Sequence, residues 1–121
     1  MLVKWCWAIL ALIHVAPALA LLRPALLTSL YGAQTGTVTY VLLHHRAALF
    51  VGVFVTCIWS LLHPESRQLG TVVVGASMLS FPMLYVVYGT PDSLRVIAIA
   101  DLIGMPFLMI AAWHAFRGQH P

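Results

Sequence analysis

The sequence predicts an all-α fold, an integral membrane four-helix bundle forming a single transmembrane domain over residues 1–121. Of the 121 residues, 62% are hydrophobic and only 7% are charged, whereas a soluble domain carries about 25% charged residues. Four apolar stretches recur along the chain, each close to the ~20 residues that a helix needs to cross a bilayer. In hydrocarbon the backbone must satisfy its own hydrogen bonds, so these stretches are expected to be helices.

Polar segments rich in Gly, Pro, Ser and Thr separate the four apolar stretches, as turns require. The first stretch has Lys4 near its start and Ala18-Leu19-Ala20 near its end, which resembles a signal peptide. Its apolar run is long, however, and we expect a retained helix. The predicted helices span about residues 2–22, 38–62, 69–88 and 94–116.

The loop after the first predicted helix contains the signals of a short additional helix. Pro24 suits a first helical position and Gly32 suits a C-cap. The residues between them are apolar enough to lie at the membrane surface. The sequence therefore predicts a short interfacial helix in the first loop.

Four spans place both termini on one side of the membrane. That side carries Lys4, Arg67 and Arg117, against Arg23 and Arg95 on the other side. The positive-inside rule then favours cytoplasmic termini, and we expect a multi-pass protein of a bacterial inner membrane. The aromatic residues support this topology, because the Trp residues lie near one end of the spans and the Tyr residues lie near the other. Near the termini lie Trp5, Trp7, Trp59 and Trp113; at the other end lie Tyr31, Tyr40, Tyr85 and Tyr88.

Polar side chains from all four predicted helices fall in one layer. At 1.5 Å per residue, each helix places a polar side chain about 10–12 Å from the end opposite the termini. Ionisable residues inside spans are candidate functional sites. We therefore take this layer, with a neighbouring histidine and two tyrosines just above it, as a ligand-binding or structural cluster. Its members are His14, His45, Arg46, Asp101, Ser80, Tyr85 and Tyr88.

Arg46 and Asp101 lie at matching depth on different helices, and either charge alone is costly in hydrocarbon. A guanidinium offers two parallel donors to a carboxylate. The sequence therefore predicts an Arg46–Asp101 ion pair inside the bundle, with His14 and one of His44 or His45 completing its hydrogen bonds. Consecutive residues are ~100° apart on a helix. The pattern favours His45 as the neighbour of Arg46 and leaves His44 to face another helix or a partner.

Small residues predict where helices approach closely. Ala48, Gly52 and Thr56 are spaced four apart in the second span, and Ala100 and Gly104 are spaced four apart in the fourth. Such spacing lets helix backbones touch. The expected partners are the lipid bilayer and either a larger membrane complex or a second copy of the chain.

Three functions are open for the polar cluster. It could fix helix register in a small accessory subunit. It could instead bind the polar head of a small amphipathic ligand, a quinone or a lipid, between helices. We predict one of these two functions. The alternative is a redox protein in which His14 pairs with His44 or His45 as axial ligands to a b-type haem, or in which these imidazoles bind another metal.

Several classes of function are excluded or disfavoured. The six Lys and Arg residues are scattered singly, so nucleic-acid binding is excluded. No nucleophile with an adjacent base and no Gly-rich phosphate loop is recognisable, which disfavours an enzyme. Cys6 and Cys57 form no CxxC motif, which excludes the familiar type of membrane thiol oxidoreductase. We expect both cysteines to be buried hydrophobic residues.

Several short motifs together resemble a family of small bacterial membrane proteins with four transmembrane helices. They are His14-x-x-Pro17, Leu30-Tyr31-Gly32, LHHRAALF over residues 43–50, Ser80-Phe81 and Arg95-(x)5-Asp101. Some members of that family carry the name phosphopantetheine adenylyltransferase, but that enzyme is soluble and its HxGH motif is absent here. The resemblance maps His14, His45, Arg46 and Asp101 onto the pattern of the family, and it implies that His45, Arg46 and Asp101 form the centre of the site. It implies no substrate.

Overall fold

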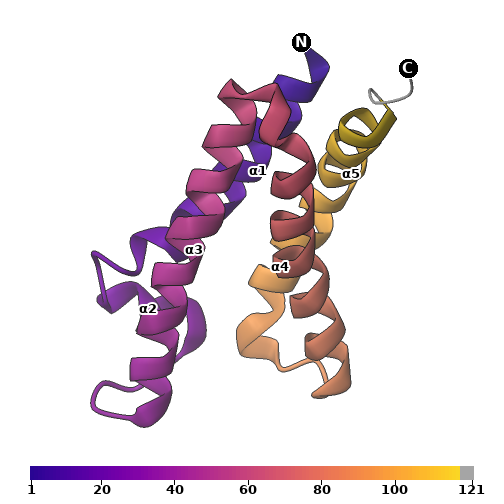
Figure 1. The fold of residues 1–121 in the computed structure, drawn as a ribbon. Coiled ribbons are helices and arrows are strands. Elements are labelled where there is room, and N and C mark those ends of the chain that lie inside the picture. The colour runs from indigo at the N-terminus through magenta and orange to yellow at the C-terminus, as the bar shows by residue number, and fades with distance from the viewer. Residues whose placement is uncertain (118–121) are drawn as a thin grey trace.

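The computed structural model describes residues 1–117, which fold into helices joined by short connections (Figure 1). Four of the helices are long and apolar enough to cross a membrane, judged by length and composition. The helices are α1 (Leu2–Leu19), α2 (Ala25–Tyr31), α3 (Val38–Leu62), α4 (Arg67–Val87) and α5 (Arg95–Arg117). Short 3₁₀ turns precede the last two, η1 (Pro64–Ser66) before α4 and η2 (Asp92–Leu94) before α5.

The predicted helix ends differ most for α1, which stops three residues before the expected Leu22. There the backbone turns, and the amides of Leu22 and Arg23 both donate to the carbonyl of Leu19, at 3.0 and 2.9 Å. This turn leads directly into α2. The predicted short helix is confirmed, with Pro24 at the N-cap and Gly32 as a left-handed C-cap at φ +66°. Gly lacks the Cβ that makes this conformation costly for other residues.

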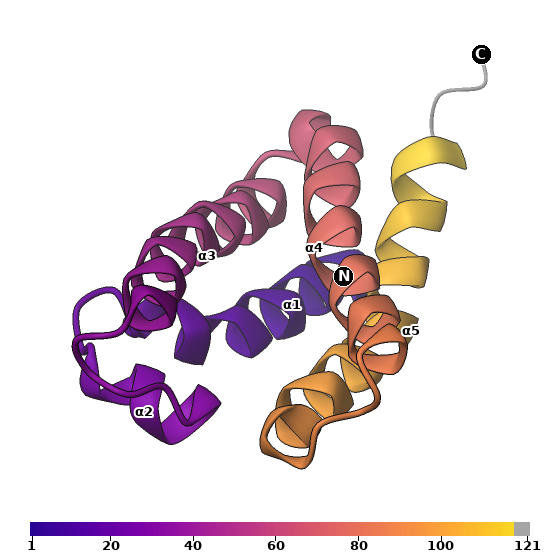
Figure 2. The same cartoon turned by 90° about the horizontal axis from the view of Figure 1, so that it is seen from below.

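The long helices form two pairs, α1 with α3 and α4 with α5 (Figures 1 and 2). The pairs meet at the end that holds both termini and diverge toward the end that holds α2. The main apolar core lies at the closed end, where all four helices contribute buried side chains, including Leu10, Cys57, Val74 and Leu108. At the open end a smaller core of Ala20, Leu27 and Ala47 involves only α1, α2 and α3. A hollow therefore lies between the two pairs.

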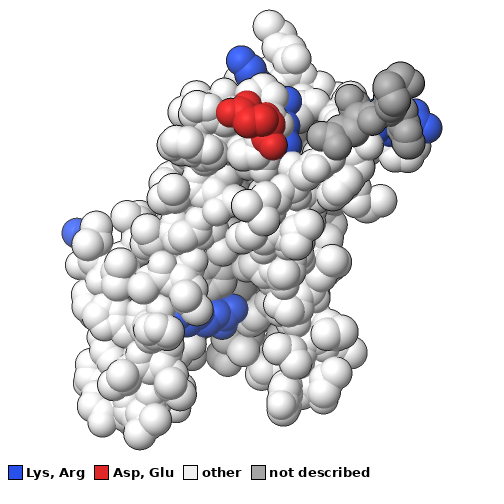
Figure 3. Space-filling view, viewed as in Figure 1, with Lys and Arg blue, Asp and Glu red and all other residues white. Residues whose placement is uncertain are grey.

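The outer faces of the long helices are apolar. Leu12, Leu49, Leu79 and Leu102 are each more than half exposed, one on every long helix. Charged atoms in Figure 3 gather at the closed end, apart from a few basic groups farther down, including one in the hollow. A surface of this kind matches the hydrocarbon of a bilayer rather than water.

Two glycines allow the helices to approach closely. A Cβ on Gly70 of α4 would overlap the hydroxyl of Ser60 and stand 3.1 Å from the Trp7 ring. A Cβ on Gly104 of α5 would overlap Met78 and Ile13. Gly52 of α3, by contrast, has no neighbour within 4 Å. The predicted close approach is therefore found at Gly104 but not at Gly52. Trp7, expected at the membrane surface, is fully buried instead.

Candidate functional site

His14 is one of three buried polar residues among residues 1–117, with Ser60 and Thr71. It lies in α1 and is only 1% exposed. Its Nδ1 lies 2.7 Å from the carbonyl of Leu10. Because a carbonyl can only accept, Nδ1 carries the hydrogen and Nε2 keeps its lone pair. That Nε2 is buried and has no hydrogen-bond partner in the described chain. An acceptor left in this state costs about 1–3 kcal/mol.

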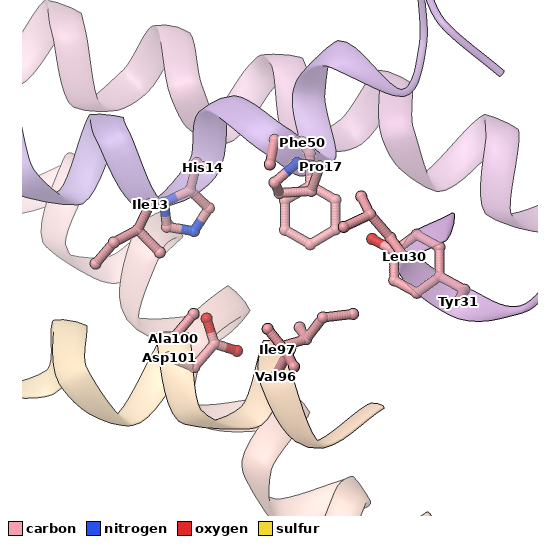
Figure 4. A pocket seen from close by; sticks show the side chains of 11 residues that line it. Ile13, His14, Pro17, Leu30, Tyr31, Phe50, Val96, Ile97, Ala100 and Asp101 are labelled. Carbon is pink, nitrogen blue, oxygen red and sulfur yellow. The ribbon is translucent and has the colours of Figure 1, made fainter. Parts of the chain in front are cut away.

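A cavity of about 130 Å³ opens beside His14, and we call it the His14 cavity. In Figure 4 the imidazole of His14 and the carboxyl of Asp101 lie on opposite walls and point toward each other. Asp101 has no hydrogen-bond or ion-pair partner among residues 1–117. The other walls come from α2, α3 and the start of α5. The lining residues are Ile13, His14, Ala16, Pro17, Leu30, Tyr31, Phe50, Val96, Ile97, Ala100 and Asp101.

Tyr31 adds a hydroxyl to the same cavity from the end of α2. Burial raises the pKa of its phenol above the usual 10.0. The charge of Arg46 lowers this pKa and that of Asp101 raises it further. The net shift is upward, so the phenol keeps its proton at neutral pH. Tyr31 is therefore a hydrogen-bond donor at the mouth of the His14 cavity.

Arg46 does not form the predicted ion pair with Asp101. In the described part of the chain the ion pairs are Arg95–Asp92, with a separation of 2.6 Å, and His63–Glu65, at 3.3 Å. The guanidinium of Arg46 instead lies near three aromatic rings. Its central carbon is 5.0 Å from the ring centre of Phe50, 5.2 Å from that of Phe81 and 5.9 Å from that of Tyr31. Cation–π attraction of this kind is worth about 0.5–2 kcal/mol.

Two further cavities meet at Arg46. The larger, which we call the Arg46 cavity, measures about 430 Å³ and includes Ser80, Tyr85 and Tyr88 in its walls. The smaller, which we call the α3–α4 groove, measures about 240 Å³ and is shared between these two helices. Arg46 and Ser80 line both of them. The predicted cluster is thus divided, with His14 and Asp101 in one cavity and Arg46, Ser80 and both tyrosines around another.

Of the two neighbouring histidines, His45 does not take the inward orientation that the sequence predicted for it. His45 is exposed on the outside of α3. His44 is partly buried, and its Nε2 lies 3.0 Å from the carbonyl of Leu21. The end of a helix leaves carbonyls without intrahelical partners, and Leu21 follows the end of α1. His44 therefore donates to a carbonyl that the turn leaves free, which turns His45 away from the bundle.

The three histidines proposed as haem ligands do not come together. His14 faces its own cavity, His44 uses its Nε2 on Leu21, and His45 is exposed. These residues do not fit a bis-histidine haem site. Within residues 1–117, no group of three or more His, Cys, Asp or Glu side chains is placed to hold a metal ion.

Sequence reasoning missed the aromatic neighbours of the polar cluster. Phe50 lines both the His14 cavity and the α3–α4 groove, so it separates them. Its position four residues after Arg46 could have revealed the contact, because residues at that spacing share a helix face. The contacts of Phe81 and Tyr31 with Arg46 could not be predicted from sequence spacing, because both residues belong to other helices.

Comparison with known proteins finds no relative of this chain. No protein-family model, curated protein or solved structure matches the chain.

Proposed function

We propose that the chain is an integral membrane protein that binds a small amphipathic ligand of the quinone class, with the ligand's ring in the His14 cavity. The observation that carries this proposal is the buried Nε2 of His14, which has a lone pair and no partner. A ligand that donates a hydrogen bond to this atom removes the cost of leaving it unsatisfied.

The size of the cavity limits the part of the ligand that enters it. An apolar cavity of about 150 Å³ accommodates one benzene molecule, and the His14 cavity measures about 130 Å³. The His14 cavity is therefore close in size to a single six-membered ring, and a lipid head group with its chains does not fit. Most of the lining is apolar, which suits a ring flanked by a hydrocarbon tail.

The polar groups of the cavity favour the reduced form of such a ring. A quinol carries two hydroxyl groups, and one of them can donate to Nε2 of His14. The carboxyl of Asp101, on the facing wall, is available to the second hydroxyl. An oxidised quinone has only acceptor oxygens, so it can pair with Tyr31 but offers His14 nothing. We therefore expect the quinol to bind more tightly than the quinone.

The proposed location is a bacterial inner membrane with cytoplasmic termini. It is supported by the apolar length of four helices and by the distribution of Lys4, Arg67 and Arg117 against Arg23 and Arg95. On this orientation the His14 cavity lies in the leaflet away from the cytoplasm.

The test is a titration of the detergent-purified protein with a short-chain ubiquinol analogue and with its oxidised form. His14→Leu should weaken quinol binding about tenfold or more, because it removes the acceptor at Nε2. His45→Leu is the matched control, since the same change is made on an exposed histidine of α3, and it should leave binding unchanged. Calorimetry or equilibrium dialysis measures both affinities.

Two results would contradict the proposal. One is equal affinity of the wild type and His14→Leu for the quinol. The other is no saturable binding of either form by the wild-type protein.

A further inference from the structure

In the described part of the chain, no carboxylate lies within ion-pair distance of the Arg46 guanidinium. The chain has three acidic residues. Glu65 pairs with His63, and Asp92 pairs with Arg95. Asp101, the third, lines the His14 cavity, and its charge acts on Arg46 without direct contact. A guanidinium in hydrocarbon is stabilised by a close opposite charge or by strong hydrogen bonding. Within residues 1–117 Arg46 has neither, so an anion from outside the chain can complete its surroundings.

The guanidinium also lacks hydrogen-bond acceptors. It has five N–H donors, yet Arg46 makes no hydrogen bond with any residue of the described chain. The rings of Phe50, Phe81 and Tyr31 attract its charge through their π faces but cannot accept from all of these donors. The aromatic rings therefore hold the guanidinium in place and leave its donors free for a ligand.

The cavities next to Arg46 are lined by both hydroxyl-bearing and apolar side chains, which suits an amphiphilic ligand. The Arg46 cavity, at about 430 Å³, brings the hydroxyl-bearing side chains of Ser80 and Tyr85 to the same space as the guanidinium. From there the α3–α4 groove continues along Leu49 and Val53 of α3, with Ser77 and Ser80 on its α4 side. In Figure 3 a basic group is visible within the hollow between the two helix pairs. The Arg46 cavity thus opens into a groove whose α3 wall beyond Arg46 is hydrocarbon.

We propose that Arg46 binds the phosphate of an anionic phospholipid, with the head group in the Arg46 cavity and an acyl chain in the α3–α4 groove. A guanidinium binds phosphate through two parallel hydrogen bonds, which an ammonium group cannot do. Tyr85 supplies a further hydroxyl donor, whereas the Ser80 hydroxyl already donates to the carbonyl of Ser77 at 3.1 Å. This site is separate from the quinone-class site of the proposed function, because it lies on the other side of Phe50 and requires an anion.

The depth of Arg46 favours a lipid over a free anion. Arg46 lies eight residues into α3, about 12 Å along the helix from its outer end. A free phosphate ion would have to leave water to reach it. A phospholipid is already in the bilayer, and its chain gains the apolar contacts of the groove.

Native mass spectrometry of the full chain in detergent tests the site with three probes. These are a phosphatidylglycerol, a diacylglycerol with the same chains, and inorganic phosphate. The wild type should retain phosphatidylglycerol and should bind the other two at least about tenfold more weakly, because only the first combines the charge with the chains. Diacylglycerol binding equally well would overturn the role of the phosphate. Inorganic phosphate binding equally well would show that a free anion, not a lipid, occupies the site.

Arg46→Met should reduce phosphatidylglycerol binding about tenfold or more, and Arg46→Lys should restore only part of it, because lysine lacks the planar fork. Arg23→Met removes an exposed arginine outside the cavity and should have no effect. If Arg46→Met does not fold, Val53→Trp fills the groove while keeping the charge and should also block the lipid. If the variant that folds still retains phosphatidylglycerol, the proposed site is wrong. His14→Leu should not change lipid binding, so the two sites can fail independently.

Discussion

Gly70 determines how closely three helices pack at the closed end of the molecule. Ser60 of α3 and Trp7 of α1 both contact the position that its side chain would occupy. The Trp7 ring is fully buried, so moving it aside would disturb the side chains packed around it. The close packing of the three helices therefore requires glycine at this position.

Gly70→Ala should therefore destabilise the protein by about 1–3 kcal/mol, the usual cost of overpacking a core. Gly52→Ala is the same change in α3 at a position with no neighbour within 4 Å. It should be neutral or stabilising by up to about 1 kcal/mol, because alanine favours a helix. Unfolding in detergent measures both. A similar loss of stability in the two variants would show that packing at Gly70 is not the cause.

Counting residues along each helix gave the depth of the polar side chains but not their partners. Depth depends only on the rise per residue, which is the same in every helix. Partners depend on how each helix is rotated about its axis, and that rotation is set by tertiary contacts. The hydrogen bond from His44 to Leu21 is such a contact. It could not be predicted, because it depends on where the backbone turns after α1.

At the scale of elements, α2 depends on hydrogen bonds from its surroundings. A helix of seven residues is not stable alone in water. The hydroxyl of Tyr40 donates to the carbonyl of Pro24 at 3.0 Å, and His44 donates to Leu21 just before it. Both donors come from α3, which therefore fixes α2 and, through Tyr31, one wall of the His14 cavity.

Loss of the His44 bond should loosen this region. In His44→Leu we expect faster amide hydrogen exchange over residues 21–31, because the anchor of the turn to α3 is gone. His45→Leu, one residue away and exposed, should leave that exchange unchanged. Mass spectrometry of deuterium uptake gives the comparison. Unchanged exchange in both variants would mean that the other contacts of α2 hold it without His44.

For the whole molecule, the sequence predicted the four apolar helices and their order but not the divergence of the two pairs. Apolar length and turn residues define each helix locally. The divergence comes from contacts between distant residues, which cluster at the closed end around Leu10, Cys57, Val74 and Leu108. Since large hydrophobic side chains occur on both the exposed and the buried faces of these helices, hydrophobicity does not mark where the pairs separate.

Both termini lie at the same end of the helices, and this leads to a prediction about membrane topology. In a protein lacking Cys6 and Cys57, Lys4→Cys and Glu65→Cys should react with an impermeant maleimide from one side of the membrane. Ser93→Cys, at the other end of the helices, should react only from the opposite side. All three positions are exposed, so access should depend on sidedness alone. Labelling of Lys4→Cys and Glu65→Cys from different sides would refute the four-span arrangement.

The divergence of the helix pairs makes the molecule a wedge, narrow where the termini lie and broad where α2 lies (Figure 1). Placed across a bilayer, it presents a longer perimeter to one leaflet than to the other. Curvature that expands the leaflet around the broad end therefore matches the shape of the molecule, and the opposite curvature does not.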